Sequence, residues 1–110
     1  MKTICIKTKL KEDTIDEVRQ WFQTLNDRRD EVRESMQNEG VIVESAFLDK
    51  QGDDYFLIYY MRADDVKHAY DVFNKSTLAI DHYHKDCWKK YCEGRVVLEE
   101  LLALDRIKSI

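Results

Sequence analysis

The amino-acid sequence predicts one α+β domain spanning residues 1–110, with its elements in the order strand, helix, strand, strand, helix, strand. Two kinds of periodicity lead to this prediction, because segments of alternating apolar residues are followed by segments in which apolar residues recur every three or four positions. The chain has no proline and three glycines, and each glycine falls where the periodicity changes. With 110 residues, of which 44% are hydrophobic, the chain is large enough for one folded core.

The composition excludes several classes of protein. Lys and Arg number 18 against 22 Asp and Glu, so the net charge is −4 and no basic surface for nucleic acid is expected. The longest apolar stretch, Tyr55–Met61, is much shorter than the roughly 20 residues of a membrane-spanning helix. The first residues lack the apolar run of a signal peptide, and an odd number of cysteines gives no disulfide framework. We therefore expect a cytoplasmic protein with reduced cysteines that binds neither nucleic acid nor a membrane.

The first part of the chain is predicted to form a strand and a long helical segment. Residues Thr3–Leu10 alternate in hydrophobicity, which predicts a strand. Asp13 or Thr14 can cap the following helix, and Gly40 ends it in the position of a left-handed cap. The polar run Asn26–Asp30 is also compatible with a break, after which its last residue would cap a second helix. The apolar stripe of the segment consists of Ile15, Val18, Phe22, Leu25, Val32 and Met36.

A β-hairpin is predicted next. Residues Val41–Asp49 and Asp54–Arg62 are rich in β-branched and apolar residues, and the turn Lys50–Asp53 contains Gly52. The second strand is apolar at successive positions, so both of its faces must be covered. Helices of this domain cover one face of the sheet. We therefore expect a second copy of the chain, or a ligand pocket, on the other face.

The C-terminal part is predicted to contain helices and a closing strand. Asp64 can cap a helix whose apolar side includes Val66, Ala69, Tyr70 and Phe73. A further helical piece covers about Ile80–Glu93. The segment Arg95–Ile107 fits either a helix or a strand by periodicity. A strand at about Glu99–Asp105 would complete the ferredoxin-like order β-α-β-β-α-β, so we predict a strand there, with an antiparallel sheet that pairs into a dimeric α/β barrel.

His84 is the strongest candidate for catalysis. It shares a helical stripe with Ile80, Trp88 and Tyr91, so its ring should point inward. Asp81 lies three residues earlier and can approach the imidazole. A carboxylate that orients a half-buried histidine is the arrangement of a general base, and Trp88 would line the same pocket. The alternative is that Asp81 caps the helix and His84 is a core histidine.

Glu44 is the second candidate, because it is the charged residue of the otherwise apolar or small segment Val41–Phe47. If Val43, Ser45 and Phe47 face the helices, Glu44 faces the other side of the sheet, inside the predicted pocket and with a raised pKa. The alternative is that Glu44 pairs with an arginine.

Arg29, Tyr59 and Tyr60 are candidate ligand-binding residues. Arg29 occupies the helical stripe, where it can lie along the surface, pair with an acid such as Glu44, or bind an anionic ligand. One of the two adjacent tyrosines must face the side of the sheet away from the helices, and a buried hydroxyl there needs a hydrogen-bond partner.

No metal site or cofactor is predicted. His82, His84 and Cys87 resemble a metal spacing, but residues two apart on a helix diverge by roughly 200°. The chain has no glycine-rich phosphate loop, CxxC or HExxH motif, which gives no support to nucleotide enzymes, redox dithiols or zinc proteases.

Three short stretches carry a resemblance to a known family: Glu44-Ser45-Ala46-Phe47-Leu48, Tyr59-Tyr60-Met61, and Ile80-Asp81-x-x-His84. They resemble a family of small uncharacterised bacterial proteins that is similar to the dimeric α/β-barrel superfamily. The resemblance implies a ferredoxin-like protomer and a dimer, with pockets between sheet and helices. That superfamily includes cofactor-free monooxygenases and sugar mutarotases, although the histidine-tryptophan-proline stretch of the mutarotases is missing here.

These observations predict a homodimer that binds a small molecule and catalyses a cofactor-free proton transfer or oxidation. His84 would act as the base, Asp81 would orient it, and Glu44 and Tyr60 would lie in the pocket. The alternative is a non-catalytic homodimer, structural or regulatory, whose side chains fill the sheet face and leave no cavity.

Overall fold

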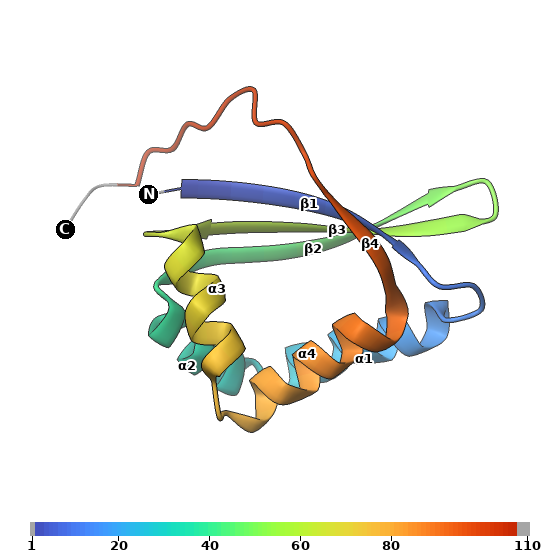
Figure 1. Ribbon diagram of the computed structural model, residues 1–110, viewed down its shortest axis with the longest axis horizontal. Helices are drawn as coiled ribbons and strands as arrows, with labels where there is room; N and C mark the ends of the chain where they lie inside the picture. Colours follow the sequence, from blue (N-terminus) through green and yellow to red (C-terminus); the bar gives the residue numbers. More distant parts are fainter. Residues whose placement is uncertain (1, 108–110) are drawn as a thin grey trace.

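The computed structural model describes residues 2–107 and forms a four-stranded antiparallel sheet with four helices (Figure 1). The elements in chain order are β1 (Lys2–Leu10), α1 (Ile15–Asp27), α2 (Arg29–Glu39), β2 (Val41–Gln51), β3 (Asp54–Ala63), α3 (Val66–Lys75), α4 (Ala79–Tyr91) and β4 (Cys92–Val97). The predicted α+β class is thus confirmed. None of the helices within residues 2–107 has the length and apolar character needed to cross a membrane.

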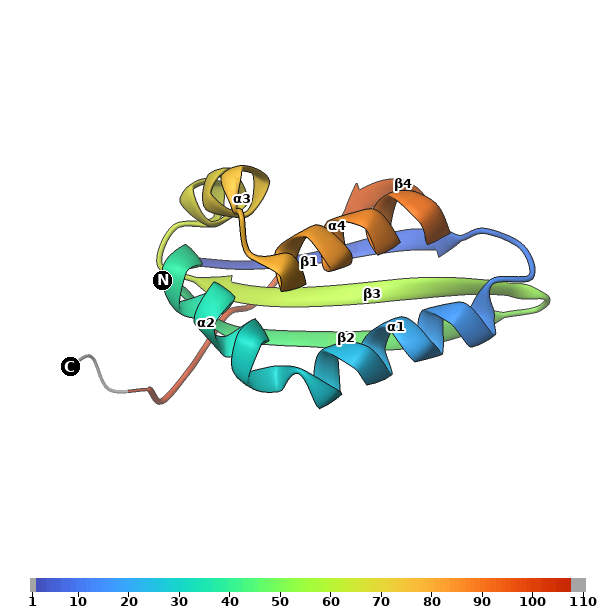
Figure 2. The same ribbon diagram turned by 90° about the horizontal axis from the view of Figure 1, so that it is seen from below.

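The sheet has the strand order β2-β3-β1-β4, and the helices lie on one of its faces (Figures 1 and 2). Ile6, Tyr59 and Ala46 are paired across β1, β3 and β2 and face the helices. The residues next to them, Cys5, Tyr60 and Ser45, are paired in the same way and point to the opposite side. We call this opposite side the open face.

The long helical segment is divided, as the polar run Asn26–Asp30 allowed. The first helix ends at Asp27 and the second begins at Arg29, with Arg28 rather than Asp30 as its N-cap residue. The second helix ends at Gly40, whose φ of 72° is the left-handed conformation that glycine adopts without strain. Helix α3 is capped by Asp65 instead of Asp64, because the Asp65 side chain accepts a hydrogen bond from the backbone N–H of His68.

An irregularity at the start of β2 reverses the predicted orientation of its side chains. The pairing with β3 shifts between Val41 and Val43, which places one additional residue in β2. As a result, Glu44 pairs with Met61 and faces the helices. The prediction that Glu44 points to the open face is wrong, because an inserted residue moves every following side chain to the other face.

The last strand is β4, formed by Cys92–Val97, and the predicted strand at Glu99–Asp105 is wrong. The register between β1 and β4 shifts at Gly94, which has a φ of 66° and forms a bulge in the strand. The glycine that suggested a boundary between helix and strand therefore lies inside the strand. Because β4 starts directly after α4, the sheet is complete before the leucine-rich segment begins.

Residues 98–107, which we call the tail, have no regular secondary structure and cross the open face (Figures 1 and 2). Thr3 donates a hydrogen bond to Glu100, and Arg62 forms an ion pair of 3.7 Å with Asp105. Several large side chains remain exposed on the tail and nearby: Leu101 (87%), Leu102 (75%), Leu104 (77%), Phe47 (60%) and Val96 (60%). The sheet is thus apolar on both faces, as the sequence predicts, and the tail covers only part of the second face.

The buried side chains form two clusters between the sheet and the helices. One consists of Leu10, Val18, Trp21, Leu57 and Cys87. The other consists of Val41, Met61, Ala63 and Ala69.

Candidate functional site

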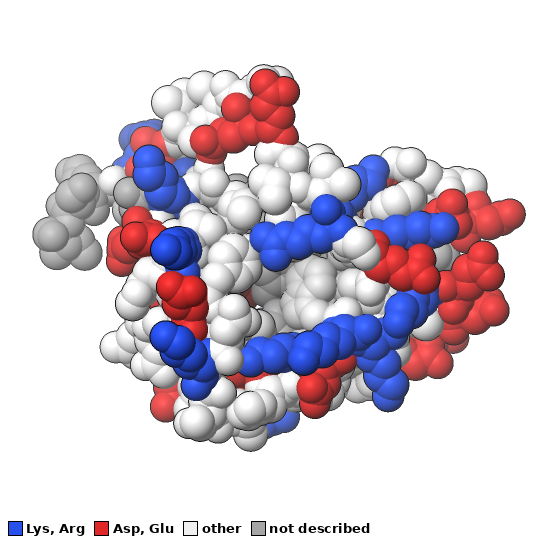
Figure 3. Space-filling model, in the orientation of Figure 1, with Lys and Arg blue, Asp and Glu red and all other residues white. Residues whose placement is uncertain are grey.

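A cavity of about 440 Å³ lies between the sheet and the helices. Its walls are largely apolar and aromatic, and include Ile6 of β1, Met36 of α2, Tyr70 and Phe73 of α3, and Trp88 of α4. The space-filling view shows a hollow between α3, α4 and β4, with Lys and Arg side chains on two of its sides (Figure 3). Its size is within the usual range of small-molecule pockets.

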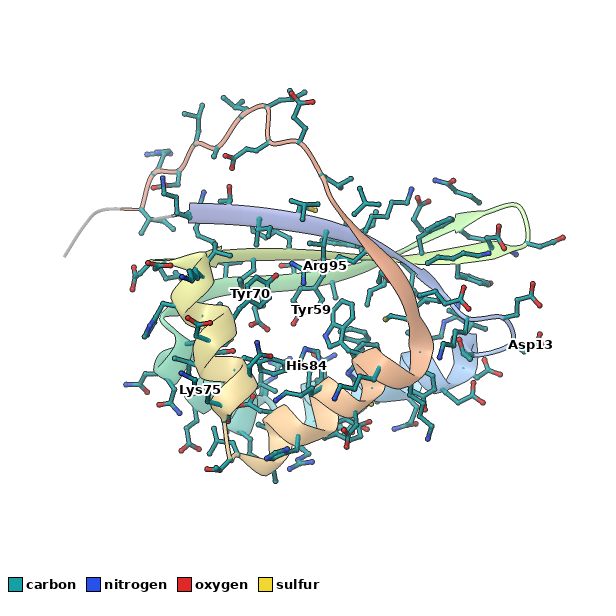
Figure 4. The ribbon with its side chains drawn as sticks, in the orientation of Figure 1. Asp13, Tyr59, Tyr70, Lys75, His84 and Arg95 are labelled. Carbon is teal, nitrogen blue, oxygen red and sulfur yellow. The ribbon has the colours of Figure 1, made fainter. Side chains whose placement is uncertain are left out.

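A chain of hydrogen bonds connects three polar side chains of the cavity to the core. The indole N–H of Trp21 donates to Nδ1 of His84 over 3.0 Å. Oη of Tyr59 lies 3.3 Å from Nε2 of His84 and donates to Oε2 of Glu44 over 2.8 Å. Figure 4 shows Tyr59, Tyr70 and His84 pointing toward one another from the sheet, α3 and α4. Helix α1, α4, β3 and β2 each supply one member of this chain.

The shorter of the two indole contacts of His84, the one from Trp21, favours one tautomer of the ring. Because Nδ1 accepts the indole proton, a neutral imidazole carries its own proton on Nε2. That N–H points to the hydroxyl oxygen of Tyr59, and the Tyr59 hydroxyl donates its own hydrogen bond to Glu44. Trp88 Nε1 also lies 3.3 Å from Nε2 of His84. It could donate a hydrogen bond there only in the other tautomer, in which Nδ1 carries the proton and Nε2 is bare.

The surroundings of His84 favour a positioning role over that of the predicted general base. Burial lowers its pKa to about 4, although the charge of Asp81 acts in the opposite direction. Both ring nitrogens are engaged within the protein. In this arrangement the imidazole holds Tyr59 in position and stays neutral at neutral pH.

Asp81 does not form the predicted contact with His84. Its Oδ1 accepts a hydrogen bond of 2.5 Å from Ser35 of α2, and its Oδ2 accepts one of 2.5 Å from Ser76, between α3 and α4. Asp81 is also not the N-cap of α4, since Leu78 occupies that position. The buried carboxylate instead ties α2 to the start of α4, and Trp21 takes the orienting role that was predicted for Asp81.

Glu39 and Asp81 share the hydroxyl of Ser35. Oγ of Ser35 contacts both Asp81 and, at 3.1 Å, Oε1 of Glu39. One hydroxyl has a single proton to donate, so a proton on one of the two carboxyls would complete both hydrogen bonds. Glu39 is the favoured carrier of that proton, because burial and then the charges of Glu44 and Asp81 raise its pKa to about 8.

Glu44 is the acidic group best placed for chemistry. It lines the cavity and has one hydrogen bond, from Tyr59 to Oε2, within residues 2–107. Burial raises its pKa, the hydrogen bond from Tyr59 partly offsets this, and the charge of Asp81 raises it further. Burial and the neighbouring Glu44 raise the pKa of Tyr59 well above its usual value, so Tyr59 keeps its proton.

Of the predicted site residues, the structure brings Glu44, Tyr59, His84 and Trp88 together around the cavity. Two others lie elsewhere. Tyr60 is on the open face, because its neighbour Tyr59 faces the helices. Arg29 is exposed and donates to Asn26 over 3.2 Å, since the break between α1 and α2 takes it out of the apolar stripe.

Sequence reasoning missed Trp21, Ser35 and Glu39. A signal for two of them was present. Ser35 lies three residues after Val32 and Glu39 lies four residues after Ser35, so both continue the helical stripe. For Trp21, its place three residues after Val18 indicated burial but not the hydrogen bond to His84. Among residues 2–107, no group of three or more His, Cys, Asp and Glu is positioned to hold a metal ion.

The proton on Glu39 predicts a specific pH dependence of stability. The folded pKa of about 8 is above the unfolded value of 4.5, so the folded state binds more protons between these pH values and loses stability as the pH rises. The free energy of unfolding of the wild-type protein falls by at most roughly 1.4 kcal/mol per pH unit in this range. Glu39→Gln has no carboxyl group at this position, so this decrease should be missing. Relative to wild type, Glu39→Gln should gain a few kcal/mol in free energy of unfolding between pH 5 and pH 9, measured by urea denaturation. The exposed Glu34→Gln of the same helix should show no such gain, and an equal change in both variants would contradict the assignment.

The tautomer of His84 can be observed directly. At pH 7, ¹⁵N NMR of the imidazole should show a protonated Nε2 and a bare Nδ1. Trp21→Phe removes the indole donor and keeps an aromatic ring, so the preference for this tautomer should weaken and the pKa of His84 should rise from about 4. The ring of His82, which is exposed on the same helix, provides an internal comparison. A protonated Nδ1 in the wild-type protein would rule out the proposed direction of the hydrogen-bond chain.

Comparisons with known proteins give a family but no activity. A search of curated proteins and a search of solved structures each found no match. A family model described as "Family of unknown function (DUF6176)" matches residues 1–109. Since the match extends over nearly the whole sequence, the chain belongs to this family of unknown function.

Proposed function

We propose that the protein binds a small molecule in the sheet–helix cavity and transfers a proton to or from it, with Glu44 as the acid–base group. The observation that carries this proposal is the chain Glu44–Tyr59–His84, which places a carboxyl group with a raised pKa at the wall of a cavity. A general acid or base works best when its pKa is near the working pH. Burial raises the pKa of Glu44 and so moves it toward neutral pH.

Glu44 would remove a proton from one atom of the ligand and return it to another, as in an isomerisation. This sequence of steps is balanced in protons and electrons. Tyr59 would stabilise the carboxylate formed on loss of the proton, and His84 would hold the phenol in place. The proton-carrying groups favour such acid–base chemistry over the oxidation that the sequence also left open.

The alternative is the non-catalytic homodimer whose side chains fill the space on the sheet. The cavity of about 440 Å³ supports ligand binding over this alternative, because a packed layer of side chains normally leaves few voids larger than a water molecule. The raised pKa values of Glu44 and Glu39 support it too, since groups with shifted pKa values cluster at functional sites.

The proposal includes a ferredoxin-like protomer that forms a homodimer. The strand order β2-β3-β1-β4, with helices on one face, supports the ferredoxin-like architecture. Phe47, Val96 and the leucines of the tail support a second copy as the partner, because apolar residues of this exposure on one side of a molecule mark an interface.

Proton transfer can be tested without knowing the ligand. A mixture of small carbonyl compounds is incubated with the protein in D₂O, and deuterium incorporation is followed by ¹H NMR. We expect the wild-type protein to exchange a C–H proton of at least one compound, and Glu44→Gln to reduce the rate by 100-fold or more, on the order of the contribution of a general base. Glu34→Gln should retain the wild-type rate. Equal exchange by wild type and Glu44→Gln would refute the assigned role of Glu44.

The dimer can be tested by light scattering coupled to size-exclusion chromatography at micromolar concentration. The wild-type protein should elute with twice the chain mass of 13.2 kDa. Phe47→Asp places a charge on the open face and should shift the mass toward the monomer, because a buried unpaired charge is costly at an interface. Gln51→Asp, at the exposed end of the same strand, is the matched control. A wild-type protein that elutes only at the monomer mass would contradict the dimer.

A further inference from the structure

Three basic side chains surround the mouth of the cavity. Arg95 comes from β4, and Lys85 and Lys89 come from successive turns of α4. Figure 3 shows the hollow bordered by Lys and Arg on two sides, and Figure 4 shows Arg95 above Tyr59 and Tyr70. A chain with a net charge of −4 thus presents positive charge at the entrance to this apolar cavity.

In the part of the chain that the structure describes, none of these three cations forms an ion pair. Within residues 2–107, the ion pairs use Lys7, Lys9, Arg28, Arg33 and Arg62, and none uses a side chain of the mouth. Arg95 donates to the hydroxyl of Tyr70 over 3.1 Å and stacks 5.0 Å from its ring centre. Lys85 donates to the backbone carbonyl of Asn74 over 3.0 Å. These contacts hold Arg95 and Lys85 in place without an acidic partner.

The inner end of the cavity has the opposite character, because it offers hydrogen-bond acceptors. Glu39 uses Oε1 on Ser35, and Glu44 uses Oε2 on Tyr59. The second oxygen of each carboxyl has no hydrogen bond within residues 2–107. Glu39 is itself buried, with 6% of its surface exposed, and it lines the cavity. Aromatic side chains, Tyr70, Phe73 and Trp88, form the walls between the two ends.

We propose that the ligand of this cavity is a small organic anion, with its carboxylate or phosphoryl head at Arg95, Lys85 and Lys89, an apolar or aromatic body between the walls, and a hydroxyl group at Glu39 and Glu44. This inference rests on the proposed function, because it names the class of molecule that would meet Glu44. Arg and Lys bind carboxylate and phosphoryl groups through charge-assisted hydrogen bonds. Carboxyl oxygens that already accept or donate one bond still accept one from a hydroxyl.

The test uses a matched set of probes measured by isothermal calorimetry. 4-Hydroxyphenylacetate has an anionic head, an aromatic body and a distal hydroxyl, and 4-hydroxybenzylphosphonate replaces the carboxylate by a phosphonate. 4-Hydroxyphenylacetamide has a neutral head, tyramine has a cationic one, and phenylacetate lacks the hydroxyl. We expect at least one of the two anions to bind about tenfold more tightly than the amide and tyramine, and phenylacetate to bind more weakly than its hydroxylated counterpart.

Variants locate the head group. Arg95→Gln and Lys89→Gln should each weaken binding of the better anion about tenfold and leave binding of the amide unchanged. Lys90→Gln is the control, because Lys90 is the next residue of α4 and does not line the cavity. Its affinity should stay within twofold of wild type.

The possible outcomes separate this inference from the proposed function. Binding of tyramine or the amide as tightly as the anions would overturn the anion inference and leave the cavity as a ligand site. Failure of both anions to bind would also overturn it. The deuterium exchange of Glu44→Gln does not depend on the mouth residues, so loss of the proposed proton transfer would be seen there and not in the calorimetry.

Discussion

The hydrogen bond from Tyr59 to Glu44 allows a carboxyl group to lie inside the layer between sheet and helices. A buried carboxyl is costly unless its hydrogen bonds are satisfied. Tyr59 satisfies one oxygen, His84 fixes Tyr59, and Trp21 fixes His84. Since Trp21 is almost completely buried in the main hydrophobic cluster, the position of Glu44 depends on the packing of α1 against α4. The geometry of the site therefore depends on how the hydrophobic core is packed.

A second cluster of polar side chains connects the helices to one another and does not involve the strands. Asp81 accepts hydrogen bonds from Ser35 and Ser76 and so connects α2, α4 and the segment before α4. Ser35 also contacts Glu39, whose raised pKa favours its neutral form. This arrangement explains how three acidic side chains share one interior: one accepts two hydrogen bonds from hydroxyl groups, one has a pKa raised to about 8, and one accepts a hydrogen bond from a phenol.

The two faces of the sheet have different environments. Helices and the cavity occupy one face, and the tail crosses the other with its leucines exposed. Arg62 lies under this tail, paired with Asp105, and its Nε has no hydrogen-bond partner among residues 2–107. The tail is thus attached by polar contacts, while its apolar side chains face outward. This distribution is the physical basis for expecting a second chain on the open face.

Local periodicity and single-residue conformations were enough to predict the order of the elements up to α4 and the cap at Gly40. The break in the long helical segment was compatible with the sequence but was not required by it. The sequence also singled out Glu44, Tyr59 and His84, since polar groups in apolar segments are conspicuous. The face that Glu44 occupies could be known only from the folded sheet. A one-residue irregularity in β2 reverses the alternation, and a pattern of period two cannot reveal where such an insertion lies. Likewise, the roles of Trp21, Ser35 and Glu39 arise from contacts between different helices. The position of the last strand depends on its pairing with β1, where Gly94 forms a bulge. Pairing and contacts of this kind depend on residues distant in sequence, which local periodicity does not encode.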